Sequence, residues 1–182
     1  MRRIRLIKVR KYVILVFILS LPILLFAQSI PEINGMTAEN RPIKIPQDIK
    51  GKYSLLCFAA SQKAQADLES WLDPIYQKFI AKTGLMDDTY DLNLFFIPIV
   101  TTSNSAFANS MKKKLKENTQ VDLLPNILFC QGHEEEILKQ LKMFKSDMPH
   151  FILLDKNANI IYRTSGKYTE EKFDAIDELI EM

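Results

Sequence analysis

The sequence has few of the residues that carry redox or metal chemistry. Its 182 residues include only two cysteines and two histidines, Cys57, Cys130, His133 and His150. A protein metal site needs three or four ligands at recognisable spacings, and these four residues are scattered along the chain. The sequence therefore predicts no metal site, and we assign no cofactor and no catalytic residue.

One long apolar run is present, and it lies at the N-terminus. Six basic residues precede the run Tyr12 to Ala27, which is too short to span a membrane comfortably. This pattern predicts a signal peptide over residues 1–27, cleaved after Ala27, with an uncleaved N-terminal anchor as the alternative. We expect a periplasmic or extracellular protein that contacts the membrane only through this segment, if it is uncleaved. The residue directly after Ala27 is not a cysteine, so we expect no lipid attachment there.

A concentrated basic surface is also missing from the rest of the chain. Removal of residues 1–27 takes away six basic side chains and no acidic one, which changes the formal charge from +2 to −4. The lysines at 112–114 and 116 surround Phe107, Met111 and Leu115, whose spacing predicts the solvated side of an amphipathic helix. We therefore expect no nucleic-acid binding.

The pattern of apolar residues over 28–182 predicts one α/β domain in which strands and helices alternate. The polar segment from Ile30 to Gln47, with three prolines, is interpreted as the entry to the domain. The expected strands are 53–60, 92–100 and 126–130, and a hairpin is expected to pair 151–155 with 160–163. The expected helices are 66–82 with a kink at Pro74, about 104–118, one from Glu134, and a last one capped by Thr169.

This order of elements resembles the extracytoplasmic thioredoxin-like proteins of the thiol reductase and peroxiredoxin-related type. The residues that match are Gly51, Lys52, Phe58, Ala60 and Ser61 around the first buried strand. Met148 and Pro149, which precede His150 and the hairpin, match the cis-proline region of that family. The resemblance implies a three-layer thioredoxin-like sandwich with a central mixed β-sheet flanked by helices.

The loop that carries the two thiols of that family departs from the pattern. Ser61 and Gln62 lead into Lys63 and Ala66, which stand where the cysteines of a Cys-x-x-Cys motif are expected. Thiol–disulfide exchange requires a thiolate at this helix start, and neither an ammonium nor a methyl group can replace it. We therefore expect a redox-inactive domain. If Pro149 adjoins this loop, Lys63 and His150 lie at the same end of the sheet.

Cys57 and Cys130 fall inside apolar strands rather than at a helix start. In that setting a cysteine behaves as a small buried hydrophobe with a raised pKa. Two alternatives stay open: a disulfide between them, which requires their Cα atoms to lie within about 7 Å, and a redox thiol in a non-standard position.

The leading hypothesis is a cell-envelope protein that acts by binding an exported or envelope protein, in assembly or folding. The resemblance implies this role, since thioredoxin-like proteins without their cysteines are generally assembly or binding factors. The segment Ser70–Pro74 is similar to the mitochondrial ATP synthase assembly factors of this fold. The alternatives are a thiol oxidoreductase or peroxidase that uses Cys57 or Cys130, and a copper-handling protein in which only His150 could serve.

Overall fold

The computed structural model describes residues 29–85, 87–99, 113, 115, 117, 119–143 and 147–181. The predicted signal peptide, and most of the predicted helix over 104–118, lie outside these residues and stay predictions. Within the described residues, no helix combines the length and hydrophobicity that crossing a bilayer requires.

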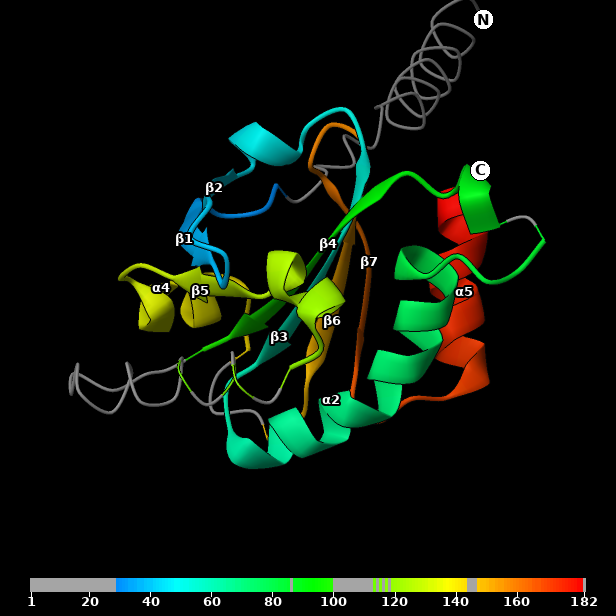
Figure 1. Cartoon of the computed structure of the whole chain (residues 1–182). Helices are drawn as coiled ribbons and strands as arrows, with labels where there is room; N and C mark the ends of the chain where they lie inside the picture. Colours follow the sequence, from blue (N-terminus) through cyan, green and yellow to red (C-terminus); the bar gives the residue numbers. More distant parts are fainter. Residues whose placement is uncertain are drawn as a thin grey trace, which may run out of the picture.

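The chain alternates strands and helices, as the sequence predicts (Figure 1). The strands are β1 (Ile33–Thr37), β2 (Pro42–Ile45), β3 (Tyr53–Ala59), β4 (Leu92–Pro98), β5 (Leu128–Cys130), β6 (His150–Leu154) and β7 (Ile160–Ser165). The helices are α2 (Gln62–Ile75), which continues as the π-helix η2 (Tyr76–Ile80), α4 (Glu134–Gln140) and α5 (Glu170–Glu181). Short 3-10 helices are η1 (Gln47–Ile49), η3 (Asp87–Thr89) and η4 (Val121–Asn126).

The central sheet has the strand order β4-β3-β6-β7 and is mixed. Strand β3 pairs parallel with β4 and antiparallel with β6, and β6 pairs antiparallel with β7 in the predicted hairpin. Successive side chains of a strand point to opposite faces, so β3 buries Leu55 and Cys57 on one face and Leu56 and Phe58 on the other. This two-sided burial explains why β3 is a continuous apolar run.

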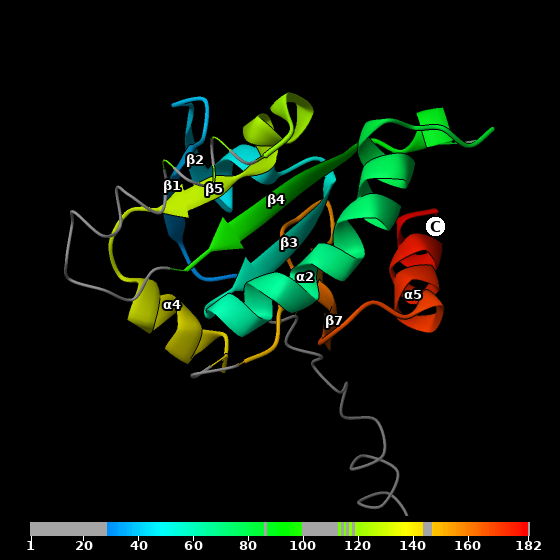
Figure 2. The ribbon, with the colours of Figure 1, turned by 60° about the horizontal axis from the view of Figure 1, so that its bottom comes forward.

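Different layers cover the two faces of this sheet. Helices α2 and α5 pack on one face, where Trp71, Ile75 and Ile176 are fully buried, and Figure 2 shows α2 lying across β3. The other face is covered by α4 and by a second, three-stranded sheet of order β2-β1-β5. The prediction of a three-layer thioredoxin-like sandwich is confirmed, with a small sheet joining the helix in one outer layer.

The polar entry segment before residue 47, to which the sequence analysis assigns no strand, contains two strands. Residues 33–45 form the antiparallel pair β1 and β2, which places Ile33 opposite Ile45 with both side chains fully buried. Pro42 stands at the first position of β2, an edge strand, where a proline is tolerated because its missing N–H breaks no bond inside the sheet. The alternating burial of these residues, rather than their prolines, is the signal for the strands.

Helix α2 begins four residues earlier than the apolar periodicity predicts. Ser61 is its N-cap: the backbone is extended there, and the Ser61 hydroxyl accepts a hydrogen bond from the Ala64 amide at 3.1 Å. Pro74 lies in the last turn of α2, and the π-helix follows directly, with the Ala81 amide donating to the Tyr76 carbonyl at 2.8 Å. The cap brings Gln62, Lys63 and Ala66 into the first two turns of the helix.

Candidate functional site

The start of α2 is the place where a thioredoxin-like protein presents its reactive thiol. Here Gln62, Lys63 and Ala66 are all exposed at this position, and the Ser61 hydroxyl already satisfies one helix amide. From Ser61 to Ala66 the chain contains no sulfur atom. A helix N-terminus lowers the pKa of a thiol placed there, but this helix has no thiol on which that effect can act.

The segment Met148–His150 lies at the same edge of the sheet as this helix start. His150 pairs with Phe58 across β3 and β6, three residues before Ser61, so both segments leave the sheet together. The prediction of a cis bond before Pro149 was wrong, because the described residues have a cis bond only between Ile45 and Pro46. The isomer of an X-Pro bond depends on its tertiary surroundings, and a Met-Pro dipeptide does not specify it. Pro149 is buried, and Met148 beside it is 47% exposed.

The two cysteines lie on opposite faces of the central sheet. Cys57 is fully buried against the face that carries α2 and α5, whereas Cys130 belongs to the cluster on the other face. Both are present as thiols, so the open alternative of a disulfide does not hold: the sheet itself separates the two sulfur atoms. Burial raises the pKa of the Cys57 thiol far above its ordinary value, which suppresses the thiolate on which its reactivity depends.

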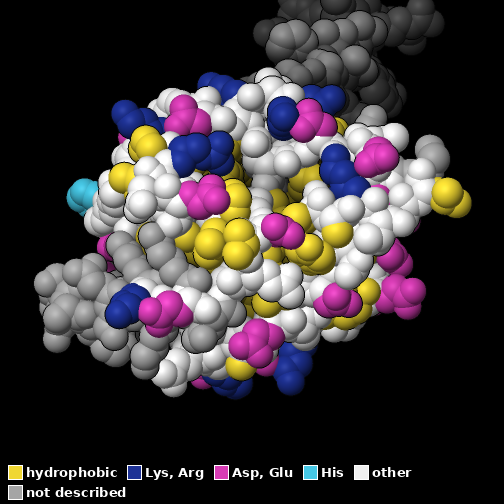
Figure 3. All heavy atoms as spheres, viewed as in Figure 1, with side chains coloured by type: hydrophobic (Ala, Val, Ile, Leu, Met, Phe, Trp, Pro, Cys, Tyr) yellow, Lys and Arg dark blue, Asp and Glu magenta, His cyan; other side chains and the backbone are white. Residues whose placement is uncertain are grey.

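An apolar hollow of about 400 Å³ adjoins the start of α2. It lies between α2, the ends of β3 and β4, and η4, with Leu68 and Leu72 on the helix side and Phe96 and Ile127 on the sheet side. Sequence reasoning missed this hollow. The sequence pattern that could have indicated it is a second apolar stripe on α2. Leu68 and Leu72 are four residues apart, so they share a helix face beside the fully buried Trp71. On the face shown in Figure 3, hydrophobic side chains gather near the centre, with acidic and basic side chains around them.

The segment Ser70–Pro74, in the second half of α2, contacts the loop between β7 and α5. The Trp71 indole N–H donates to the Gly166 carbonyl at 2.9 Å, and the Tyr168 amide donates to the Ser70 hydroxyl oxygen at 3.0 Å. Trp71 also stacks on Phe151 of β6 at a ring-centroid distance of 4.0 Å. These contacts give the segment a structural role, because they hold the helix that begins at Ser61 against the sheet.

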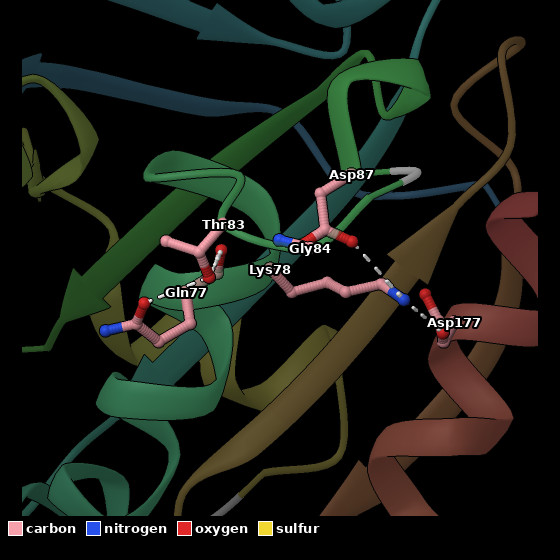
Figure 4. Close-up of polar contacts among 6 residues, drawn as sticks. All are labelled: Gln77, Lys78, Thr83, Gly84, Asp87 and Asp177. Carbon is pink, nitrogen blue, oxygen red and sulfur yellow. Dashed lines mark hydrogen bonds and ion pairs between the residues drawn. The ribbon is translucent and has the colours of Figure 1, made fainter.

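A polar cluster at the other end of α2 holds α5 in place (Figure 4). The Lys78 ammonium lies 2.9 Å from an Asp177 carboxylate oxygen and 3.8 Å from one of Asp87. Partial burial alone would lower the pKa of Lys78, but the hydrogen bonds to Asp177 and Tyr90 outweigh it and raise the pKa above its ordinary value. Asp87 in turn accepts a hydrogen bond from the Gly84 amide at 2.7 Å. The cluster connects three segments of the fold, η2, η3 and α5.

No candidate metal centre appears in the described part of the chain, where no three His, Cys, Asp or Glu side chains come together. His133 is an exposed residue at the start of α4, while His150 begins β6. The candidate site residues thus form two sets. The start of α2 and Met148–His150 lie together at one edge of the sheet, whereas the two buried cysteines are separated from each other by the sheet.

The comparison with protein-family models gives a match over residues 26–181 to the family described as ATP10 protein. The chain belongs to the ATP10 family. The match covers the whole thioredoxin-like domain, including Ser70–Pro74 and the cysteine-free helix start. Among curated protein sequences, none matches this chain significantly.

Solved structures with the same fold include members of the thioredoxin-like superfamily. BsSco, a member of the Sco family of cytochrome c oxidase assembly proteins, has a TM-score of 0.57 at 14% identity, and the match covers 85% of this chain and 92% of BsSco. A putative thiol:disulfide interchange protein DsbE from Chlorobium tepidum has a TM-score of 0.57 at 15% identity, with coverages of 85% and 95%. The exposed lipoprotein thioredoxin Etrx1 from Streptococcus pneumoniae strain TIGR4 has a TM-score of 0.54 at 18% identity, with coverages of 83% and 98%. At these identities the likeness shows the fold alone.

Proposed function

We propose that this ATP10 family member is an exported, redox-inactive assembly factor that acts by binding a partner polypeptide. The observation that carries the proposal is the start of α2, where Ser61 caps a helix whose first turns expose Lys63 and Ala66 and contain no thiol. The only remaining sulfur nucleophiles are buried on opposite faces of the sheet. The chain keeps the thioredoxin-like fold but lacks the pair of thiols that carries out disulfide exchange in that fold.

The binding surface that we propose is the edge formed by the start of α2 and the adjoining hollow. Leu68 and Leu72 supply apolar area there, and Gln62 and Lys63 supply exposed polar groups beside it. A mostly apolar patch with a polar rim is the usual anatomy of a protein interface. In thioredoxin-like proteins the reactive thiols stand at this helix start, so loss of the thiols leaves a docking surface without its chemistry.

The class of partner that we propose is an exported polypeptide or the exposed part of a membrane-complex subunit. Two observations favour it: the similarity of Ser70–Pro74 to ATP synthase assembly factors, and the assembly role of the Sco family to which BsSco belongs. Export rests on the N-terminal segment 1–27, whose basic and apolar pattern is that of a signal peptide.

Site-specific photocrosslinking in cells that express the full chain tests this proposal. A photoreactive amino acid at Gln62 should give a discrete crosslinked product, whereas the same residue at Glu178, exposed on α5, should give none. The substitution Leu68→Asp should remove the Gln62 product while the far-ultraviolet circular dichroism stays unchanged. Equal crosslinking from both positions would contradict the proposed surface.

The thiol chemistry is tested separately on the native protein. Under the binding proposal, Cys57 and Cys130 react with an alkylating reagent only after denaturant is added, because both side chains are shielded from solvent. Rapid labelling of either thiol near neutral pH, together with turnover of a disulfide or peroxide substrate, would favour the enzyme alternative instead.

A further inference from the structure

A cavity of about 160 Å³ lies beside β6 and β7, on the side of the sheet opposite α2. It shares no lining residue with the hollow proposed above for partner binding. Among the described residues, its lining combines basic and apolar side chains with Thr164 and includes no aspartate or glutamate. The basic residues are Lys142, His150 and Arg163, and the apolar ones include Leu141, Met143 and Ile152.

The hairpin register brings two of the basic residues together. Ile152 pairs with Arg163 and His150 pairs with Ser165, so His150 and Arg163 are diagonal neighbours on one face of the hairpin. The guanidinium of Arg163 is positioned by a hydrogen bond from Nη1 to the Leu141 carbonyl at 3.0 Å, just after the end of α4. Lys142 follows Leu141, and its exposed side chain lies at the cavity.

These positive groups have no acidic partner among the described residues. The ion pairs in that part of the chain include neither Arg163 nor Lys142. The Nε2 atom of His150 is buried and has no hydrogen-bond partner there. A buried polar atom without a partner costs free energy, and a guanidinium with one of its donors engaged can still bind an anion.

We propose that this cavity binds a carboxylate carried on a short apolar chain. Arg163 supplies the planar fork that matches a carboxylate, His150 supplies a ring nitrogen, and Lys142 adds charge at the rim. Leu141, Met143 and Ile152 favour an apolar chain over a fully hydrated phosphate, whose three or four oxygens would lose water without gaining partners. The carboxylate can belong to a free small acid or to the C-terminus of a polypeptide, and the experiment distinguishes the two.

The experiment follows the imidazole resonances of the full chain by NMR during titration with butyrate. The chain has two histidines, so the variant His133→Gln assigns the His150 signal directly. Butyrate should shift the His150 signal saturably and raise the pKa of His150, since a bound anion favours the protonated ring. Butyramide has the same shape without the charge and should leave the signal unchanged.

Variants test which residues hold the carboxylate. Arg163→Gln should weaken butyrate binding roughly tenfold or more, Arg163→Lys should restore part of it, and Arg41→Gln, the matched change at an arginine outside the cavity, should leave it unchanged. Lys142→Gln alters an exposed side chain and provides a second variant if Arg163→Gln fails to fold. A smaller loss of affinity in Lys142→Gln supports the site.

Three outcomes would overturn the proposal: no saturable shift at tens of millimolar butyrate, equal shifts with butyrate and butyramide, or unchanged affinity in both Arg163→Gln and Lys142→Gln. Stronger binding of inorganic phosphate than of butyrate would also overturn the carboxylate assignment.

An acetylated tripeptide that ends in leucine identifies the source of the carboxylate. If its free acid binds more tightly than butyrate and its amide does not bind, the ligand is a polypeptide terminus. If the free acid binds more weakly, it is a small acid.

Discussion

The indole N–H of Trp71 and the carbonyl of Gly166 form a buried hydrogen bond of 2.9 Å between residues 95 positions apart. The bond connects α2 to the loop that leads into α5. Gly166 is itself buried with a positive φ of 86°, a conformation that side-chain-bearing residues rarely adopt. The bond and the glycine together fix where the last helix begins.

Trp71→Phe should destabilise the fold because it removes the indole donor and leaves the Gly166 carbonyl buried without a partner. We expect a loss of about 1–3 kcal/mol in the free energy of unfolding, measured by urea denaturation. The control is Tyr76→Phe, which removes an exposed hydrogen bond to Asp122 and should have a much smaller effect. Equal losses in the two variants would show that the Trp71 bond has no special weight.

Lys78→Met should also lower stability, because it leaves the Asp177 carboxylate, which is 19% exposed, without its cation. We expect about 1–2 kcal/mol near pH 7. A double-mutant cycle with Asp177→Asn measures the coupling, and Lys113→Met, in an exposed pair with Glu117, is the control. Because folding raises the pKa of Lys78, this contribution is full below about pH 10 and is lost as the pH rises through the folded pKa. Additive losses in the cycle would contradict a coupled pair.

Sequence reasoning predicted the parts of the fold whose signals are local. The continuous apolar run of β3 and the β6–β7 hairpin were confirmed, because burial on both faces and the turn residues at Asp155–Asn159 appear directly in the sequence. The strands β1 and β2 were missed because their apolar residues alternate in short stretches between prolines, a pattern that loops share.

The candidate site could be predicted only in part for a similar reason. The absence of cysteine at the start of α2 is visible in the sequence, and in the structure Ser61 caps this helix and Lys63 lies in its first turn. The separation of Cys57 from Cys130 depends on which face of the sheet each side chain occupies. The hollow beside Leu68 and the cavity at Arg163 depend on packing between segments far apart in the chain, which no local pattern encodes.

The folding stability should decrease as the pH falls below about 6.5 because of His150. Burial, and then the charge of Arg163, lower the pKa of this histidine in the folded protein. In the unfolded chain the same side chain has its ordinary pKa of about 6.5. The stabilising difference is therefore full above about pH 6.5 and is lost as the pH falls toward the folded pKa, since only the unfolded chain takes up the proton. The groups that surround the ring are Lys142 and Arg163 at the cavity, Phe58 across β3, and Ser165 across β7.

Urea denaturation at several pH values checks this expectation. His150→Gln should flatten the dependence of the unfolding free energy on pH, whereas His133→Gln, at an exposed position, should keep the wild-type slope. If His150→Gln shows the same slope as the wild type, the acid sensitivity arises from other groups.

The retained scaffold should regain thiol chemistry when cysteines are returned to the start of α2. The double variant Lys63→Cys and Ala66→Cys places a Cys-x-x-Cys pair in the first two turns of the helix, beside the Pro149 segment. The positive end of the helix lowers the pKa of a thiol placed there. We expect this variant to reduce insulin disulfides with dithiothreitol as the reductant at a rate well above that of the unaltered chain.

The matched control is Glu171→Cys with Asp174→Cys, which creates the same spacing at the same positions in the first turns of α5, a helix that does not follow β3. Both pairs are exposed and both lie near a helix N-terminus, so a difference in rate isolates the contribution of the α2 edge. Equal rates would mean that helix position alone produces the activity. A high rate in the unaltered chain would place the chemistry at Cys57 or Cys130 and contradict a redox-inactive domain. Activity specific to the α2 pair would show that this edge still positions disulfide substrates and that the absence of sulfur at Lys63 and Ala66 is what withholds the reaction.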